Sequence, residues 1–226
     1  MSHDANRGAP GSTATASTAL AGLTRKRERS GDRELVDEVF DEALVATVST
    51  VIDDEPWSVP MLVVRHDARL LLHGSTGAGA LRQVADGAKV VISAFILDGV
   101  VVAERQFEHS ANYRSAVVRG RCRVVDGAEI ATTLDLFTNA ILAGRSGECP
   151  PHTRAELAQS LVLELAITDD NWVSKRRSGP PSSPSDQWTG IIPIVQTCQR
   201  PISASTQPVP RSVTTFIDTR NGPDSW

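Results

Sequence analysis

The sequence has few cysteines and no long apolar run. Its three cysteines, Cys122, Cys149 and Cys198, are odd in number and widely spaced, and no two form a C-x-x-C pair. This usage indicates free thiols and excludes a disulfide framework or a zinc site of the usual spacing, so we expect no metal. No stretch approaches the roughly 18 apolar residues of a membrane span, and the first residues lack the apolar region of a signal peptide. We therefore expect a soluble, cytoplasmic protein with no membrane partner.

An excess of positive charge is also missing. The 226 residues include 23 Lys and Arg against 27 Asp and Glu, a formal net charge of -4. A surface that neutralises the phosphates of a duplex needs the opposite balance, so nucleic acid is excluded as an expected partner. The sequence also lacks a recognisable Ser/His/Asp arrangement and any metal-ligand spacing. Reactive chemistry would therefore be carried by a cofactor.

The two ends of the chain have compositions that disfavour regular structure. Residues 1–24 are dominated by Ala, Ser, Thr and Gly, and we predict a disordered N-terminal arm. Residues 198–226 contain four prolines among Ser and Thr, and we predict a loose tail in which Phe216 and Ile217 could dock locally. Residues 25–197 remain as one packed domain.

Strand signals dominate between the tails. A helix is expected after Asp32, a candidate N-cap, and a second helical pattern covers residues 130–141. Three strand-like runs, over residues 44–51, 57–65 and 69–73, are separated by short turns and predict a meander.

The rest of the pattern also favours antiparallel strands. A nearly continuous apolar run over residues 89–97 predicts a strand covered on both faces, and it leads into Asp98-Gly99, a hairpin signal. Pro193 places the last strand at a sheet edge. The sum is a mainly β (α+β) fold, a six-to-eight-stranded antiparallel barrel with a few flanking helices. The further strand-like runs cover residues 100–103, 115–125, 161–167 and 188–195.

The most informative stretch is an apolar strand that ends in a small, hydroxyl-rich loop and then opens a helix. Gly74, Ser75 and Thr76 form this loop, and Arg82 lies one helical turn further on. Backbone N–H groups, hydroxyls and a cation together can bind a phosphate, although Ser75 and Thr76 would also serve to cap the helix. A dinucleotide-binding fold begins with the same order of elements. It is disfavoured because Arg82 stands where the third glycine belongs and no second such unit follows.

Five motifs follow one another in a set order along the chain. They are Asp54-x-Pro56-x-x-x-Pro60; Leu71-x-His73-Gly74-Ser75; Leu97-Asp98-Gly99; His109-Ser110-x-Asn112-Tyr113-Arg114-Ser115-x-Val117-x-x-Gly120; and Lys175-Arg176-Arg177-Ser178-Gly179-Pro180-Pro181 with Trp188-x-Gly190-x-x-Pro193. In this order they resemble the FMN-binding split-barrel proteins related to pyridoxamine 5′-phosphate oxidase, and in particular the branch that includes the nitroimidazole-resistance reductases. The resemblance covers about residues 24–197.

This resemblance implies an antiparallel split β-barrel that forms a homodimer, with two FMN molecules held in clefts between the subunits. The implied activity is that of an FMN-dependent oxidoreductase. Such an enzyme transfers hydride or electrons between a nicotinamide nucleotide, or a substrate, and a small organic acceptor. A nitro compound, a quinone or dioxygen would fit as the acceptor.

The resemblance also assigns site residues. Residues 60–62 match the segment that borders the flavin, residues 112–115 match the segment nearest its polar edge, and His73 and Tyr113 are the catalytic candidates. For His73 the competing interpretation is a half-buried hydrogen-bonding histidine, and for Tyr113 it is packing near the ring. The candidate cofactor-binding residues are Pro60, Met61, Leu62, His73, Gly74, Ser75, Thr76, Arg82, Asn112, Tyr113, Arg114, Ser115, Lys175, Arg177 and Trp188.

Other interpretations remain open at this point. A non-catalytic flavin- or haem-binding protein for storage, sensing or regulation is the main alternative, with His73, His109 or His152 as a haem ligand. The deazaflavin cofactor F420, which other split barrels use, is a further one. Arg119, Arg121 and Arg123 alternate along one predicted strand, a pattern typical of a solvated face.

Overall fold

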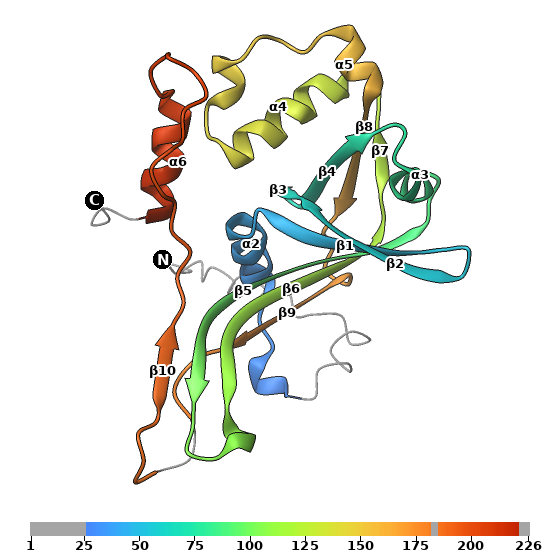
Figure 1. The fold of residues 1–226 in the computed structure, drawn as a ribbon. Coiled ribbons are helices and arrows are strands. Elements are labelled where there is room, and N and C mark those ends of the chain that lie inside the picture. Colours follow the sequence, from blue (N-terminus) through green and yellow to red (C-terminus); the bar gives the residue numbers. More distant parts are fainter. Residues whose placement is uncertain (1–25, 182–184, 222–226) are drawn as a thin grey trace, which may run out of the picture.

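The fold consists of two antiparallel sheets that share one core (Figure 1). A computed structural model describes residues 26–181 and 185–221, so the predicted N-terminal arm lies outside the described residues. The helices within them are α2 (Arg33–Glu42), α3 (Gly79–Ala85), α4 (Glu129–Ile141), α5 (Arg154–Gln159) and α6 (Arg211–Asn221), with 3₁₀ turns η1 (Arg27–Arg29), η2 (Gln106–Glu108) and η3 (Arg145–Glu148). None of these helices is long and apolar enough to cross a membrane.

The strands pair into a six-stranded sheet, sheet A, and a four-stranded sheet, sheet B. Sheet A has the order β2-β1-β5-β6-β9, with β10 on part of β5, and sheet B has the order β3-β4-β8-β7. The predicted mainly β, antiparallel split-barrel class is therefore confirmed. The strands are β1 (Val45–Ile52), β2 (Glu55–Leu62), β3 (Val64–His66), β4 (Arg69–Ser75), β5 (Lys89–Val102), β6 (Ser110–Arg121), β7 (Arg123–Val125), β8 (Ser160–Ala166), β9 (Trp172–Arg177) and β10 (Gly190–Pro193).

Helix α2 fills the space between the two sheets. The Asp32 side chain accepts a hydrogen bond from the Leu35 N–H at 3.0 Å, which is the predicted N-cap. The apolar face of α2, with Val36 and Val39 fully buried, packs in one cluster with the inner faces of both sheets. Helix α4 covers the other face of sheet B through Phe137. Among the described elements, sheet B is thus covered on both faces, and sheet A only on its inner one.

Two chain segments cross from one sheet to the other. Val63 is buried in the main core whereas Val64 packs against Phe137 under α4, so the predicted strand over 57–65 divides at this point. Its halves are β2, which pairs with β1, and β3, which pairs with β4. The predicted three-stranded meander is therefore wrong. Cys122 marks a second crossing, between β6 and β7, and such divisions are one reason why the strands exceed the six to eight expected.

The Asp98-Gly99 pair does not form the predicted hairpin. It lies inside β5, where the register with β6 shifts between Leu97 and Gly99 in a β-bulge. On the edge of β5 that faces away from β6, the Ile194 N–H donates to the Asp98 carbonyl, and this hydrogen bond helps to hold β10 in place. The edge position expected for the strand with Pro193 is confirmed, since β10 pairs only with β5.

The C-terminal segment contains α6, where we expected a loose tail (Figure 1). Ser212 donates from its N–H and its hydroxyl to the Glu148 carboxylate, at 3.2 and 2.5 Å. The Asn221 amide exchanges two hydrogen bonds with the backbone of Cys198, and Ile217 is buried. These partners are remote in sequence, so composition alone could not reveal the helix. Figure 1 shows the segment running from β10 up to α6 beside α4.

A charge network joins α2 to sheet A. The Arg114 guanidinium forms ion pairs with three carboxylates. The N···O distances are 2.7 Å to Asp98, 2.8 Å to Glu38 and 2.5 Å to Glu42. Hydrogen bonds to Asp98 and then to Glu42 raise the pKa of Arg114 above its ordinary value. Arg176 on β9 pairs with Glu38 as well. Arg114 therefore bridges three carboxylates from two different elements.

We predict that Arg114→Met lowers the free energy of unfolding by about 2 kcal/mol, because three carboxylates lose their common partner. Arg176→Met is the matched control on the neighbouring strand. It removes one exposed ion pair and should cost less than about 1 kcal/mol. Urea denaturation of both variants measures the difference, and equal losses would contradict a special role for Arg114.

We predict that Gly99→Ala destabilises the protein by about 1–3 kcal/mol, because the added methyl group overpacks the bulge. A Cβ at Gly99 would lie 2.9 Å from the Ile192 carbonyl oxygen of β10. Gly79→Ala is the control, since nothing lies within 4 Å of its Cβ position. Thermal denaturation should separate the two variants, with hydrogen exchange in β10 accelerated only in Gly99→Ala.

Candidate functional site

Sheet A has one face that points away from α2 and the main core. Because side chains alternate along a strand, the buried Ile92 and Ala94 of β5 point inward and Phe95 points outward. Phe95 is 71% exposed, so no described element covers the middle of this face. We call it the open face. Its residues include Val45, Pro60, Leu62, Lys89, Val91, Phe95, Leu97, Tyr113, Ser115, Arg119, Arg121, Lys175 and Arg177.

Six predicted cofactor-binding residues lie on the open face. Phe95, Ser115 and Lys175 stand directly opposite one another on three neighbouring strands, which places an aromatic ring, a hydroxyl and an ammonium group in one row. Lys175 has no ion-pair partner within residues 26–181 and 185–221. By strand register the six residues are Pro60, Leu62, Tyr113, Ser115, Lys175 and Arg177, of which the Arg177 guanidinium turns back to donate to Asn112 Oδ1.

Three other predicted residues point to the opposite side of the same sheet. Met61 packs against the main core, and Arg114 is the centre of the charge network with α2. Asn112 is buried; its amide donates to the Gly179 carbonyl at 3.2 Å and accepts from Arg177 Nη1 at 2.5 Å. Their side-chain interactions are within this chain, so their predicted cofactor contacts find no support in the side-chain geometry.

The loop predicted to bind phosphate lies at the end of sheet B. Gly74 permits close packing, since a Cβ there would lie 2.4 Å from Leu81 Cδ1 of α3. The Thr76 N–H donates to the Gln159 carbonyl, and the Gly77 N–H to Ser75 Oγ. Neither hydroxyl caps α3, whose N-cap is Ala78 without a side-chain bond. The capping alternative is therefore wrong, and the Ser75 hydroxyl, the Thr76 hydroxyl and Arg82 are exposed.

The two catalytic candidates do not meet. Tyr113 lies on the open face of sheet A, whereas His73 lies on sheet B beneath α4. The His73 ring makes an edge contact with Phe137 at 4.5 Å between centroids, and burial lowers the pKa of this imidazole below 6.5. Of the other histidines considered as haem ligands, His109 is exposed near η2 and His152 pairs with Asp135 of α4.

Two aromatic side chains, Trp188 and Phe95, are exposed, and only Trp188 was among the predicted cofactor-binding residues. Trp188 is 71% exposed just before β10, so it does not fill the core. Phe95 was missed because the run over 89–97 predicted a strand covered on both faces. The sequence carries no signal for this alternation, because the exposed Val91, Phe95 and Leu97 stand among equally apolar buried residues.

A cavity of about 400 Å³ lies elsewhere, between α2, β3 and α4. Its walls include Phe40, Val64 and Leu136, with the ion-paired Arg65 and Asp41 at its polar side. No predicted site residue lines it. The open face gathers the chemically suited residues, so we take that face, and not this cavity, as the candidate site.

We predict that the imidazole of His73 titrates below 6.5 and that this makes folding stability depend on pH. The unfolded chain takes up a proton near pH 6.5 whereas the folded chain does so only at lower pH. Stability should therefore fall as pH decreases through 6.5 toward the folded pKa, and the loss should be absent near pH 8. His73→Asn should show a weaker pH dependence in thermal denaturation, and identical curves for both proteins would contradict the assignment.

Comparisons with known proteins agree with this architecture. The family model described as pyridoxamine 5′-phosphate oxidase matches residues 32–171. No curated protein matches the chain significantly.

Several solved structures are similar to this fold. The FAD and haem binding protein from Mycobacterium smegmatis is 37% identical, with a TM-score of 0.79 over 82% of this chain and 95% of its own. The flavocytochrome Anf3 from Azotobacter vinelandii is 24% identical, with a TM-score of 0.79 over 85% and 94%. A putative 5-nitroimidazole antibiotic resistance protein from Bacteroides thetaiotaomicron is 17% identical, with a TM-score of 0.53 over 64% and 83%. By the family match and the 37% identity, this chain belongs to the pyridoxamine 5′-phosphate oxidase family.

Proposed function

We propose that the protein is a flavin-dependent oxidoreductase that holds the isoalloxazine ring on the open face of sheet A. The observation that carries this proposal is the row formed by Phe95, Ser115 and Lys175. A flavin ring needs an apolar surface, with hydrogen-bond donors and positive charge near its polar edge. Phe95 and Leu97 supply the apolar area, and Ser115 and Lys175 supply the donors, so the residues present fit the group.

The flavin, when bound, would exchange hydride or electrons between a nicotinamide nucleotide, or a substrate, and a small organic acceptor such as a nitro compound, a quinone or dioxygen. The chain's own residues would bind and orient it. The Lys175 ammonium would attract negative charge at the polar edge of the ring, and Tyr113, one row further along, would border it. The resemblance in sequence implies FMN, whereas the Mycobacterium smegmatis relative binds FAD.

We further propose that a second copy of the chain covers the open face. Phe95, Val45 and Val51 are each more than half exposed on this surface, and large apolar patches of this kind mark interaction sites. A two-fold interface would place the same face of both subunits together. The ring would then be enclosed on both sides, with each flavin touched by two chains.

A flavin with haem is the second candidate function, because the relative at 37% identity is named as binding both groups. A histidine that binds haem iron must have an unprotonated ring nitrogen to coordinate the metal. His73 would suit this, since burial lowers its pKa and keeps the ring uncharged at neutral pH. Its contact with Phe137 under α4 would have to open to admit the haem.

The absorption spectrum of the purified protein tests both candidates. We expect the two visible flavin bands, a flavin released on denaturation that chromatography identifies as FMN or FAD, and bleaching by NADH or NADPH without oxygen. A Soret band would add haem. A protein that binds neither flavin on titration would contradict the proposal, and displacement by F420 but not by FMN would indicate the deazaflavin.

Lys175→Met should weaken flavin binding by roughly tenfold, because one charged contact is lost. Arg176→Met is the matched control: Arg176 is the next residue on β9, but its side chain pairs with Glu38 on the α2 side. Fluorescence titration measures both affinities. Equal affinity in the two variants would remove Lys175 from the site.

A further inference from the structure

The outward side chains of sheet A divide into two halves that differ in charge. On β1 and β2 they are uncharged, and the strand register assigns them as Val45, Thr47, Ser49, Val51, Pro56, Ser58, Pro60 and Leu62. On β5 and β6, positive charge lies at one end of the strands, where Lys89 stands opposite Arg121 and Arg119 is two residues away. We call Lys89, Arg119 and Arg121 the basic end.

The turn between β1 and β2 carries the opposite charge. Asp53, Asp54 and Glu55 are exposed there, and Figure 1 shows the β1–β2 hairpin extending beyond the rest of sheet A. We call these three residues the acidic turn. Because Ser49 of β1 stands opposite Val91 of β5, the acidic turn and the basic end lie at the same end of the sheet, on neighbouring pairs of strands.

This placement of charge makes the open face complementary to a second copy of itself. Consider a two-fold axis that runs along the strands, above the boundary between β1 and β5. It turns one copy so that its β1 lies over β5 of the other copy and its β2 lies over β6. Residues keep their level along the sheet, because the axis is parallel to the strands, and the two sheets pack with their strands nearly aligned. The acidic turn of each copy then meets the basic end of the other.

The same rotation matches the apolar side chains of the two halves. Thr47 stands opposite Ser93, so two residues further along Val45 is level with Phe95, and Val45 is also opposite Leu62. Val45, Leu62 and Phe95 are 52%, 44% and 71% exposed. In the dimer, Val45 of one copy comes to lie over Phe95 of the other, so this apolar area leaves the water.

The rotation also accounts for the separation between predicted cofactor-binding residues. Within one chain, Leu62 of β2 and Ser115 of β6 stand at the same level but three strands apart, which is about 14 Å. The two-fold axis brings Leu62 of one copy opposite Ser115 of the other. The second copy therefore contributes the β2 side of the flavin site.

We propose that two copies of the chain join face to face by this rotation, with the acidic turn of each bound to the basic end of the other. The inference rests on the proposed function, because it specifies how the second copy covers the flavin site. Complementary charges fix the register of an interface, whereas the apolar centre alone would allow the two faces to slide. Asp53 lies about 7 Å beyond the level of Lys89, a gap that the long side chains of the basic end span.

Charge reversal tests the pairing. The turn variant combines Asp53→Asn, Asp54→Asn and Glu55→Lys, and the end variant combines Arg119→Glu and Arg121→Glu. Asparagine is chosen because the φ angles of Asp53 and Asp54 are 51° and 64°, in the left-handed region that it tolerates. Either variant alone should raise the dissociation constant of the dimer at least about tenfold in analytical ultracentrifugation. An equimolar mixture should recover dimerisation, because opposite charges then meet at both contacts.

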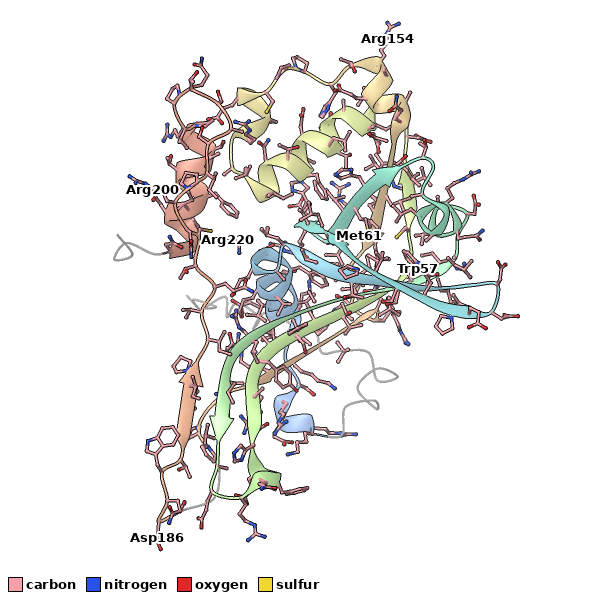
Figure 2. The ribbon with its side chains drawn as sticks, in the orientation of Figure 1. Trp57, Met61, Arg154, Asp186, Arg200 and Arg220 are labelled. Atoms are coloured by element: carbon pink, nitrogen blue, oxygen red, sulfur yellow. The ribbon has the colours of Figure 1, made fainter. Side chains whose placement is uncertain are left out.

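The matched control changes charge away from the open face. Arg154→Glu on α5 should leave the dissociation constant unchanged, since Figure 2 shows this side chain pointing away from the body of the protein. Added sodium chloride should weaken the wild-type dimer and affect the dimer of the turn variant less, because salt screens the charge contacts.

The outcomes separate this inference from the proposed function. A wild-type dimer that neither variant weakens would overturn the pairing and leave another arrangement of the second copy in place. Loss of the dimer without recovery on mixing would also overturn it. A wild-type chain that stays monomeric overturns the inference, while flavin bound by that monomer would keep the ring on the open face. A dimer that recovers on mixing but binds no flavin supports the inference and contradicts the proposed function.

Discussion

The structure depends on the apolar face of α2, which fills the space between two antiparallel sheets. Val36, Val39 and Phe40 pack against the inner faces of both sheets at once, so each sheet gives one face to the same core. Helix α4 covers the second face of sheet B. No helix in the part of the chain that the structure describes covers the outer face of sheet A, and Phe95 is exposed at its centre. The candidate site lies on this uncovered sheet face.

The charged side chains of sheet A also differ between its two faces. On the α2 side of sheet A, Arg114 binds Asp98, Glu38 and Glu42 and thereby holds the helix to the sheet. On the open face, Lys175, Arg119 and Arg121 have no carboxylate partner among the described residues. Alternation along the strands separates the two sets, since neighbouring residues such as Arg176 and Lys175 point to opposite sides. One set serves stability, and we infer that the other serves the flavin and the second copy.

Much of the fold could be predicted from the sequence because its signals are local. The cap at Asp32 and the strand periodicity each depend on residues close in the chain, and the structure confirms them. The errors arose where distant partners decide the conformation. The chain passes from sheet A to sheet B at Val63, because Val63 packs in the main core and Val64 packs in the separate cluster under α4. Asp98-Gly99 forms a bulge inside β5, where β6 pairs on one edge and β10 on the other. For the site, family motifs identified the strands, but only the register showed which side chains share the open face.

The pairing of β4 with β8 has a consequence for how the chain is made. These strands align from Arg69 opposite Ala166 to Ser75 opposite Ser160, and the ion pair between Arg69 and Glu164 joins residues 95 positions apart. Non-local pairing of this kind slows folding, because a long loop must close before the contact forms. While the ribosome is still synthesising the second half, the fully apolar Leu70–Leu72 can pair with β3 on one edge, but its other edge still lacks β8. An unpaired edge of this kind is prone to aggregation, so the first half of the nascent chain becomes safe only when its later strands emerge.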